Sequence, residues 1–302
     1  MASQRVEVQV GGRTLSLSNL DKVLYPQAGV TKAQVIDYYT RIAPVVLPHL
    51  AGRPLTLKRY PDGVEAEFFY EKEIPRHAPD WVTRVPIPTT RRGRVINFTV
   101  VEELATLVWL ANLADLELHT SLSLASDIGT PTVVAFDLDP GAPATVIECC
   151  DVALLMRDAL AGVGLACHPK TSGSKGMQVY LPLNTRAAYP QTAAFAKGLA
   201  ELLEREHGDL VVSNMRKELR TGKVLVDWSQ NSESKTTVCA YSLRARPRPT
   251  VSTPLRWEEV EAAAAARDPE ALAFEADDVL ARVEANGDLF APVLEQRQAL
   301  PG

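Results

Sequence analysis

The chain has 302 residues, of which 46% are hydrophobic and 23% are charged, as in an ordinary soluble globular protein. These values exclude long disorder, collagen and a coiled coil. The net charge of −5, from 32 basic and 37 acidic residues, excludes a histone-like polycation. The charge is uneven, however: residues 252–302 hold 11 acidic and four basic side chains, whereas residues 216–248 hold eight basic and three acidic ones. The second segment gives this acidic protein a basic surface suited to a phosphate-bearing partner.

The four cysteines and the N-terminus indicate the compartment. No two cysteines form a C-x-x-C pair, so a structural zinc site is not expected, and each cysteine is expected to be a small buried hydrophobe with a reduced thiol. The N-terminal MASQRVEVQV has no apolar signal region, and no stretch reaches 18 apolar residues. We therefore expect a soluble, cytoplasmic protein without a membrane partner.

The predicted elements alternate irregularly along the chain. Thr31 is expected to cap a helix whose apolar face includes Val35, Ile36 and Ile42, and residues 55–60 alternate as a strand does. Further helices are predicted over residues 101–116, 151–160 and 192–206, and strands over residues 132–138, 177–183 and 224–228. Because no regular βαβ order appears, the sequence predicts an α+β (mixed α/β) fold. We expect one domain over residues 1–302, in which residues 252–302 form a helical C-terminal cap on a core of residues 1–251.

Two carboxylates stand at the end of the predicted strand 132–138. Residues two apart in a strand point to the same face, so Asp137 and Asp139 should project together while Leu138 packs on the other side. Paired carboxylates at a strand end are suited to divalent metals bound with nucleotide phosphates. Taken alone, the pair is better explained as a solvated strand end, because D-x-D is a common chance pattern.

Two later segments carry matching chemistry. The segment TSGSKG at residues 171–176, expected between a helix and a strand, offers backbone N–H groups, hydroxyls and Lys175 to a triphosphate, although an ordinary polar turn has the same composition. It is not a Walker A loop, because Lys175 is followed by Gly176. Asp227, at the end of the predicted strand 224–228, could supply the third carboxylate of a two-metal site.

At these residues the sequence resembles the polymerase domain of bacterial DNA ligase D, within the archaeo-eukaryotic primase superfamily. The resemblance runs from about Leu17 to Arg248 and is most specific at FDLDPG (136–141), TSGSKG (171–176) and GKVLVDWSQN (222–231). It implies a primase-like catalytic core with helices around central β-sheets. It also implies a nucleotidyltransferase that extends DNA ends and fills short gaps, prefers ribonucleotides and uses two divalent metals, manganese or magnesium.

The resemblance also implies roles for individual residues. The metals would be held by Asp137, Asp139 and Asp227, which would also be the catalytic residues. The nucleotide would be bound by His119, Ser172, Lys175, Gln230, Arg244 and Lys58, and its base would stack on the aromatic pair Phe69 and Tyr70. The 5′-phosphate on the far side of a DNA gap would be held by Asn19, Lys22 and Lys32. Residues 216–223 would form a mobile basic loop near the metals.

The partners and the alternatives follow from the same comparison. DNA with gaps or broken ends and nucleoside triphosphates are the expected ligands, and Ku and an ATP-dependent DNA ligase are possible protein partners. The chain has no K-x-D-G adenylation motif, so it is expected to carry no ligase of its own. End joining and excision-repair gap filling both remain open as pathways. The other readings are a non-catalytic module that binds 5′-phosphorylated ends, and a DxD glycosyltransferase, for which Asp227 and the lysines would be unnecessary.

Overall fold

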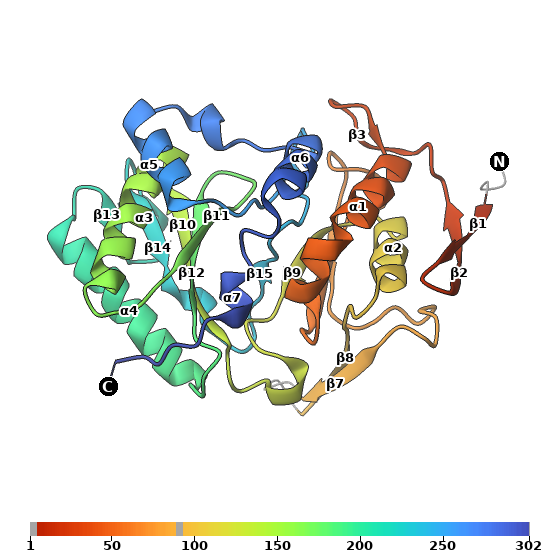
Figure 1. Cartoon of the computed structure of the whole chain (residues 1–302), viewed down its shortest axis with the longest axis horizontal. Coiled ribbons are helices and arrows are strands. Elements are labelled where there is room, and N and C mark those ends of the chain that lie inside the picture. Colours follow the sequence, from red (N-terminus) through yellow and green to blue (C-terminus); the bar gives the residue numbers. More distant parts are fainter. Residues whose placement is uncertain (1–4, 89–92, 302) are drawn as a thin grey trace.

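The structure, a computed structural model, describes residues 5–88 and 93–301. Its strands form two larger sheets, and each sheet has its own helices and its own hydrophobic core (Figure 1). Within the described residues no helix is long and apolar enough to cross a membrane. All four cysteines are buried and free, as predicted. The mixed α+β class predicted from the sequence is confirmed.

The first sheet has six strands, in the order β15-β9-β5-β8-β7 with β6 paired to β5. Its members are β5 (Leu55–Arg59), β6 (Phe69–Glu71), β7 (Arg84–Pro88), β8 (Val95–Thr99), β9 (Asp115–Thr120) and β15 (Thr237–Val238). Helices α1 (Lys32–Leu50) and α2 (Leu104–Asn112) pack against each other and share one core with this sheet. α1 begins as predicted, because the Thr31 side chain accepts a hydrogen bond from the Gln34 backbone and Gln34 caps Thr31 in return.

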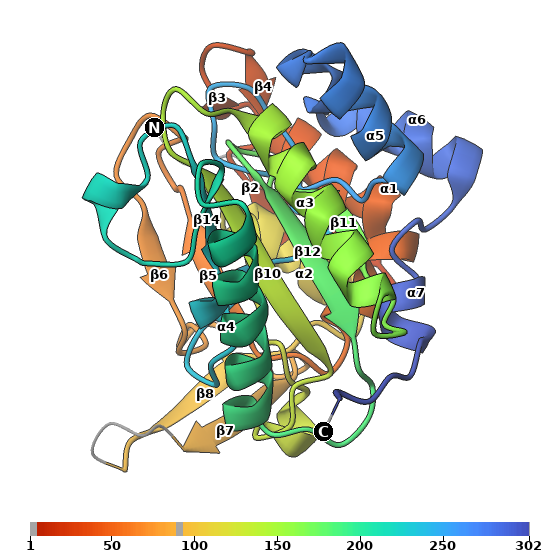
Figure 2. The ribbon, with the colours of Figure 1, turned by 90° about the vertical axis from the view of Figure 1, so that its left-hand side faces the viewer.

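The second sheet has five strands, in the order β11-β12-β10-β14-β13. Its members are β10 (Val133–Pro140), β11 (His168–Thr171), β12 (Met177–Pro182), β13 (Val211–Val212) and β14 (Val224–Asp227), and only β13 and β14 pair in parallel. Helices α3 (Val146–Ala161) and α4 (Tyr189–Glu206) cover one face of this sheet (Figure 2). The inward side chains of β10, such as Phe136 and Leu138, are fully buried in the second core.

The smaller elements complete the chain. Two hairpins pair β1 (Arg5–Val10) with β2 (Arg13–Ser18) and β3 (Val23–Tyr25) with β4 (Val30–Thr31). Four 3-10 helices are η1 (Ala125–Asp127), η2 (Lys217–Leu219), η3 (Trp228–Gln230) and η4 (Pro269–Leu272). The C-terminal helices are α5 (Trp257–Ala266), α6 (Ala276–Asn286) and α7 (Pro292–Glu295).

The segment that follows Ser252 contributes to both cores. Leu255 and Val260 are buried in the second core, whereas Val279 and Phe290 are buried in the first. Accordingly α5 packs on α3, α6 packs on α1 and α7 packs on β12. Near its end the Asp288 carboxylate lies 2.8 Å from His49 Nε2 on α1 and accepts a 2.6 Å hydrogen bond from the Tyr241 hydroxyl. This segment therefore ties the two halves of the molecule together.

Two predictions of local structure were wrong. The apolar run 101–116, predicted as one helix, ends as a helix at Asn112, and β9 begins at Asp115. Ala114, with φ +56°, reverses the chain between them, and pairing of β9 with β5 outweighs the helical pattern of the run. The segment 171–176 connects two paired strands, β11 and β12, not a helix and a strand. The short strand β11 was not predicted, because its four residues include Pro169 and carry too little pattern.

Candidate active site

The three aspartates are brought together by the pairing of β10 with β14. Asp137 lies directly opposite Asp227 in the antiparallel register, and Asp139 lies two residues farther along β10. Because directly opposed residues of antiparallel strands point to the same face, all three carboxylates project from one side of the second sheet. Asp137 and Asp227 are half-buried, Asp139 is exposed, and Leu138 between them is fully buried on the other face. The alternation that the sequence predicted is therefore present.

Two of the three aspartates, Asp137 and Asp227, accept hydrogen bonds from neighbouring residues that orient their carboxylates. Asp227 accepts hydrogen bonds from the Ser229 backbone N–H at 2.9 Å and from Gln230 Nε2 at 2.8 Å. Asp137 accepts one from Gln178 Nε2 at 3.0 Å, and Gln178 Oε1 in turn accepts one from the buried Lys170 ammonium at 2.6 Å. Gln178 and Lys170 were not identified from the sequence, because Gln178 stands alone in an apolar strand and Lys170 lies on the short strand β11, which was not predicted.

Burial and mutual repulsion disfavour the charged forms of the aspartates on this face. Burial raises the pKa of Asp137 to about 6, and the neighbouring charge of Asp139 adds to the shift. Burial also raises the pKa of Asp139, and the charge of Asp227 raises it further. These carboxylates carry more negative charge than their surroundings neutralise, and a bound cation would supply the missing positive charge.

The donor set fits a divalent cation by its chemistry. Carboxylate oxygens are the ligands that magnesium and manganese prefer. As the side chains lie, however, no group of three or more His, Cys, Asp or Glu residues within the described part of the chain is gathered closely enough to hold a metal ion. Asp137 is bonded by Gln178 of the neighbouring strand β12, and Asp227 is bonded by Ser229 and Gln230, which directly follow β14.

A small cavity of about 190 Å³ adjoins these aspartates and brings most of the predicted nucleotide residues together. Its lining includes His119, Asp137, Asp139, Ser172, Lys175, Gln178, Gln230 and Arg244. Lys175 is exposed, whereas the Ser172 hydroxyl accepts hydrogen bonds from the Ser174 and Gly176 backbone N–H groups, each at 3.2 Å. The glycines of the β11–β12 turn are required by close packing, since a Cβ at Gly176 would lie 2.0 Å from the Leu138 carbonyl oxygen.

Lys58 and the aromatic residues lie beside this cavity on the first sheet. Lys58 Nζ lies 4.5 Å from the ring centre of Phe68 and 5.7 Å from that of Tyr70, and the Tyr70 ring is 6.3 Å from His119. Phe69 faces away from them, over the Arg59 guanidinium at 5.0 Å. The structure thus pairs Tyr70 with Phe68, not with Phe69, on the side of His119. All three rings are at least 42% exposed, so they are free to contact a ligand.

Backbone hydrogen bonds link the three residues predicted to hold a 5′-phosphate, of which Asn19 and Lys22 lie between β2 and β3 and Lys32 is the first residue of α1. Asn19, with φ +54°, accepts a backbone hydrogen bond from Lys22, whose carbonyl accepts one from the Lys32 backbone. Lys22 is partly exposed, and its ammonium bonds Asp62 at 2.6 Å. Lys32 is only 5% exposed and donates to the Ser18 carbonyl at 2.7 Å. Burial lowers the pKa of Lys32 to about 8, and the positive charge of Lys22 adds to the shift.

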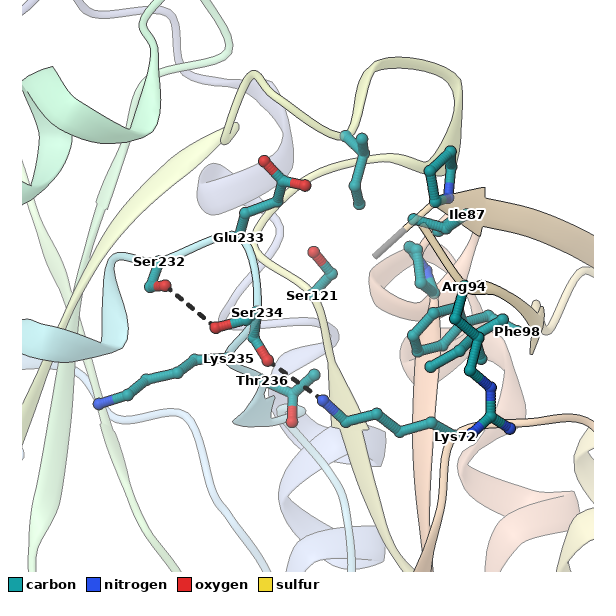
Figure 3. Close-up of a pocket in the computed structure, with 14 residues that line it drawn as sticks. Lys72, Ile87, Arg94, Phe98, Ser121, Ser232, Glu233, Ser234, Lys235 and Thr236 are labelled. Carbon is teal, nitrogen blue, oxygen red and sulfur yellow. Dashed lines mark hydrogen bonds between the residues drawn. The ribbon is translucent and has the colours of Figure 1, made fainter. Parts of the chain in front are cut away.

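A second, larger cavity of about 670 Å³ was not predicted from the sequence (Figure 3). It is lined by apolar side chains of the β7–β8 hairpin, such as Ile87 and Phe98, and by the basic side chains of Lys72, Arg94 and Lys235. Lys72 reaches across it and donates to the Ser234 carbonyl at 3.2 Å. Thr236 lines both this cavity and the smaller one beside the aspartates. The two cavities are therefore neighbours, and the larger one combines apolar and basic groups.

The basic segment 216–223 also lies at the aspartates. It contains η2, and the Gly222 backbone N–H bonds the Gly141 carbonyl at 3.0 Å, directly after β10. The charge of Arg220 lowers the pKa of Asp139 in opposition to burial, so this arginine is close to the carboxylate. Its mobility, expected from the sequence, stays a prediction.

Comparison with known proteins agrees with this arrangement. The family model described as the LigD primase-polymerase domain matches residues 31–290. The chain is 42% identical over 279 residues to the multifunctional non-homologous end joining protein LigD of Mycolicibacterium smegmatis, covering 92% of this chain and 36% of that protein. It is 30% identical over 277 residues to the bifunctional non-homologous end joining protein LigD of Bacillus subtilis, covering 91% and 43%. The chain thus spans less than half the length of these relatives.

A solved structure shares the whole fold. The polymerase domain of Mycobacterium tuberculosis ligase D, in complex with DNA, superposes with a TM-score of 0.86 at 39% sequence identity, covering 94% of this chain and 99% of that one. Two sheets, the three aspartates on one face and the matching family model point to the same conclusion. The chain belongs to the LigD primase-polymerase domain family, and it is a polymerase domain of the nucleotidyltransferase class.

Proposed function

We propose that this domain adds nucleotides to DNA 3′ ends and fills short gaps during the repair of double-strand breaks by end joining. The single observation that carries the proposal is the register of β10 and β14. It places Asp137, Asp139 and Asp227 on one face, beside a cavity lined by His119 and Arg244. Acidic and basic groups in adjacent positions are what a metal-bound nucleoside triphosphate requires.

The three aspartates would hold two divalent cations, manganese or magnesium. When bound, such cations neutralise the triphosphate and lower the pKa of the attacking hydroxyl. The chain's own groups then bind and orient the nucleotide. Lys175 and Arg244 would hold the phosphates by charge-assisted hydrogen bonds, with Ser172 and His119 beside them. Gln230, which bonds Asp227, would lie next to the sugar and the carboxylates.

Base recognition would come from the first sheet, and end recognition from the segment 19–32. Tyr70, together with Phe68 or Phe69, would stack on a base. The Lys58 ammonium would bind the triphosphate. Lys22 and Lys32, with Asn19, would hold the downstream 5′-phosphate. The larger cavity, with its apolar and basic lining, is suited to an unpaired strand that approaches the aspartates.

The finer features of the activity are part of the same proposal. We propose a preference for ribonucleotides, on the basis of the family resemblance. End joining is favoured over excision-repair gap filling because both relatives are named as end joining proteins. Ku and an ATP-dependent ligase would be the protein partners, and the site of action would be the cytoplasm, at the nucleoid, where broken chromosomal ends occur.

Incorporation of labelled nucleotides into gapped DNA tests the proposal. Wild-type protein with manganese should extend a one- or two-nucleotide gap that bears a downstream 5′-phosphate. Asp137→Asn and Asp139→Asn should each abolish extension, whereas Asp209→Asn, an exposed aspartate after α4, should not. Tight binding of the gap without extension would show a non-catalytic end-binding module and would overturn the proposal.

A further inference from the structure

We propose that Glu117 is the positioning residue of the nucleotide site: its buried carboxylate holds Lys58, His119 and Arg244 in the arrangement that receives the triphosphate. The inference rests on the proposed function, because it assigns these three residues to the nucleotide. Glu117 itself does not line the cavity beside the aspartates. It would therefore act through the residues that it holds.

Glu117 lies in the middle of the first sheet, where its neighbours are fixed by strand pairing. It is 1% exposed and stands directly opposite Lys58 in the register of β9 with β5. Lys58 Nζ donates to its two carboxylate oxygens at 3.3 and 3.2 Å. His119, two residues along the same face of β9, has its Nε2 at 2.9 Å from Oε2. Both contacts therefore follow directly from the backbone.

Arg244 reaches the same carboxylate from a distant part of the chain. Its Nε lies 3.4 Å from Glu117 Oε2, and the backbone N–H of Ala245 donates to Oε1 at 3.0 Å. The guanidinium also donates to the Ser172 carbonyl in the β11–β12 turn. Glu117 thus holds the Arg244 side chain between the first sheet and the β11–β12 turn of the second sheet.

The charge of Glu117 allows two cations, Lys58 and Arg244, to lie close together beside His119, whose pKa burial lowers. Burial raises the pKa of Glu117, but the hydrogen bond from His119 and the positive charges of Arg244 and Lys58 outweigh it and hold the pKa well below its usual range. Burial lowers the pKa of Lys58, and Glu117 opposes that loss of charge. Without the carboxylate, the cations would repel one another and turn toward solvent.

Two mechanisms predict opposite signs for removal of this charge. A carboxylate near a triphosphate repels it, so simple Coulomb interaction predicts tighter nucleotide binding when Glu117 is neutralised. Positioning predicts weaker binding, because the cations lose their common partner. The sign of the change in nucleotide affinity therefore separates the two explanations.

The test compares Glu117→Gln with wild type and with a matched control. Glu259→Gln is the control, because Glu259 is a partly buried carboxylate that pairs with Arg282 in the C-terminal helices, away from the nucleotide residues. We expect Glu117→Gln to raise the KM for ribonucleoside triphosphates at least tenfold, with kcat lowered less than fivefold. Its Kd for 5′-phosphorylated gapped DNA should stay within twofold of wild type. Glu259→Gln should change none of these three quantities.

A double-mutant cycle checks that Glu117 works through its partners. Lys58→Gln alone should raise the KM, and Glu117→Gln should raise it much less in that background than in wild type. An unchanged or lowered KM in Glu117→Gln would overturn the inference, as would an equal loss of DNA affinity. If Glu117→Gln does not fold, Glu117→Asp keeps the charge but shortens its reach, and it should raise the KM at least threefold; an unchanged KM would refute the role. A wild-type protein that incorporates no nucleotide would instead refute the proposed function.

Discussion

Replacing Lys22 and Lys32 together by methionine should remove the preference for a downstream 5′-phosphate. Methionine is the suitable replacement, because the Lys32 stem is buried and a shorter side chain would leave a cavity. A phosphate monoester carries about −1.5 to −2 charges at neutral pH. Two ammonium groups that bond it should contribute about 1–3 kcal/mol, which is roughly tenfold to a hundredfold in affinity.

The two lysines are not equally available to bind a phosphate, because Lys22 is paired with Asp62. Removing that partner should therefore change the affinity in the opposite direction to removing the lysines. Lys22 is paired with Asp62, whose side chain is 71% exposed, and an exposed pair of this kind is worth about 0–1 kcal/mol. Asp62 therefore competes weakly with the phosphate. Asp62→Asn should release Lys22 and tighten binding of the phosphorylated gap by up to about fivefold.

The preference for a 5′-phosphorylated gap should depend on pH through the protonation of Lys32. Its pKa is lowered to about 8, so it is protonated at pH 7 and about 90% deprotonated at pH 9. Since the phosphate dianion binds the protonated amine, the preference should fall as the pH rises from 7 to 9.5.

Fluorescence anisotropy with gaps ending in 5′-phosphate or 5′-hydroxyl, at two salt concentrations, measures the ratio of the two dissociation constants. A matched control, Arg186→Met with Lys197→Met, removes two exposed charges near α4 and should leave the ratio unchanged. The reasoning is refuted if the Lys22–Lys32 double variant keeps the wild-type ratio.

Three other predictions concern the aspartates, the choice of nucleotide and metal, and the stability of the fold. Asp227→Asn should lower gap extension more than a hundredfold while DNA affinity stays within twofold; measurable extension by the purified variant would contradict the two-cation assignment. Single-nucleotide incorporation should favour a ribonucleotide over its deoxyribonucleotide and manganese over magnesium, and equal efficiency for both sugars would count against the proposed preference. Asp288→Asn should lower the free energy of unfolding at pH 7 by about 1–3 kcal/mol. Burial raises the pKa of Asp288, but His49 and Tyr241 hold it below its ordinary value, so its contribution is complete above that value and is lost as the pH falls. Thermal unfolding between pH 3 and 7 should therefore depend less on pH in this variant than in wild type.

The sequence predicted elements whose pattern is local. The period-2 arrangement around Leu138 placed Asp137 and Asp139 on one strand face, and the Thr31–Gln34 pair marked the start of α1. The position of Asp227 directly opposite Asp137 depends on pairing between segments 90 residues apart, and no local pattern encodes that register. Its place at a strand end suggested Asp227 as a third carboxylate, and the family resemblance implied the metal role, but neither predicted the pairing with Asp137.

Residues whose role depends on burial were missed for a related reason. Glu117 directly follows the run 101–116, which the sequence predicts as a helix, so its place on a strand beside His119 was not predicted. The rings 68–70 did carry a usable signal. Alternation along a strand puts Phe68 and Tyr70 on one face and Phe69 on the other, as the contacts with Lys58 and Arg59 show.

The C-terminal segment has a consequence for how the molecule unfolds. A chain of this length with two separate hydrophobic cores would ordinarily be expected to melt in two steps. Here the same 50-residue stretch buries Leu255 and Val260 in one core and Val279 and Phe290 in the other. Loss of either core would detach this stretch and expose apolar surface of the other. We therefore expect the aspartate-bearing sheet and the sheet that carries Glu117 to unfold together as one cooperative unit.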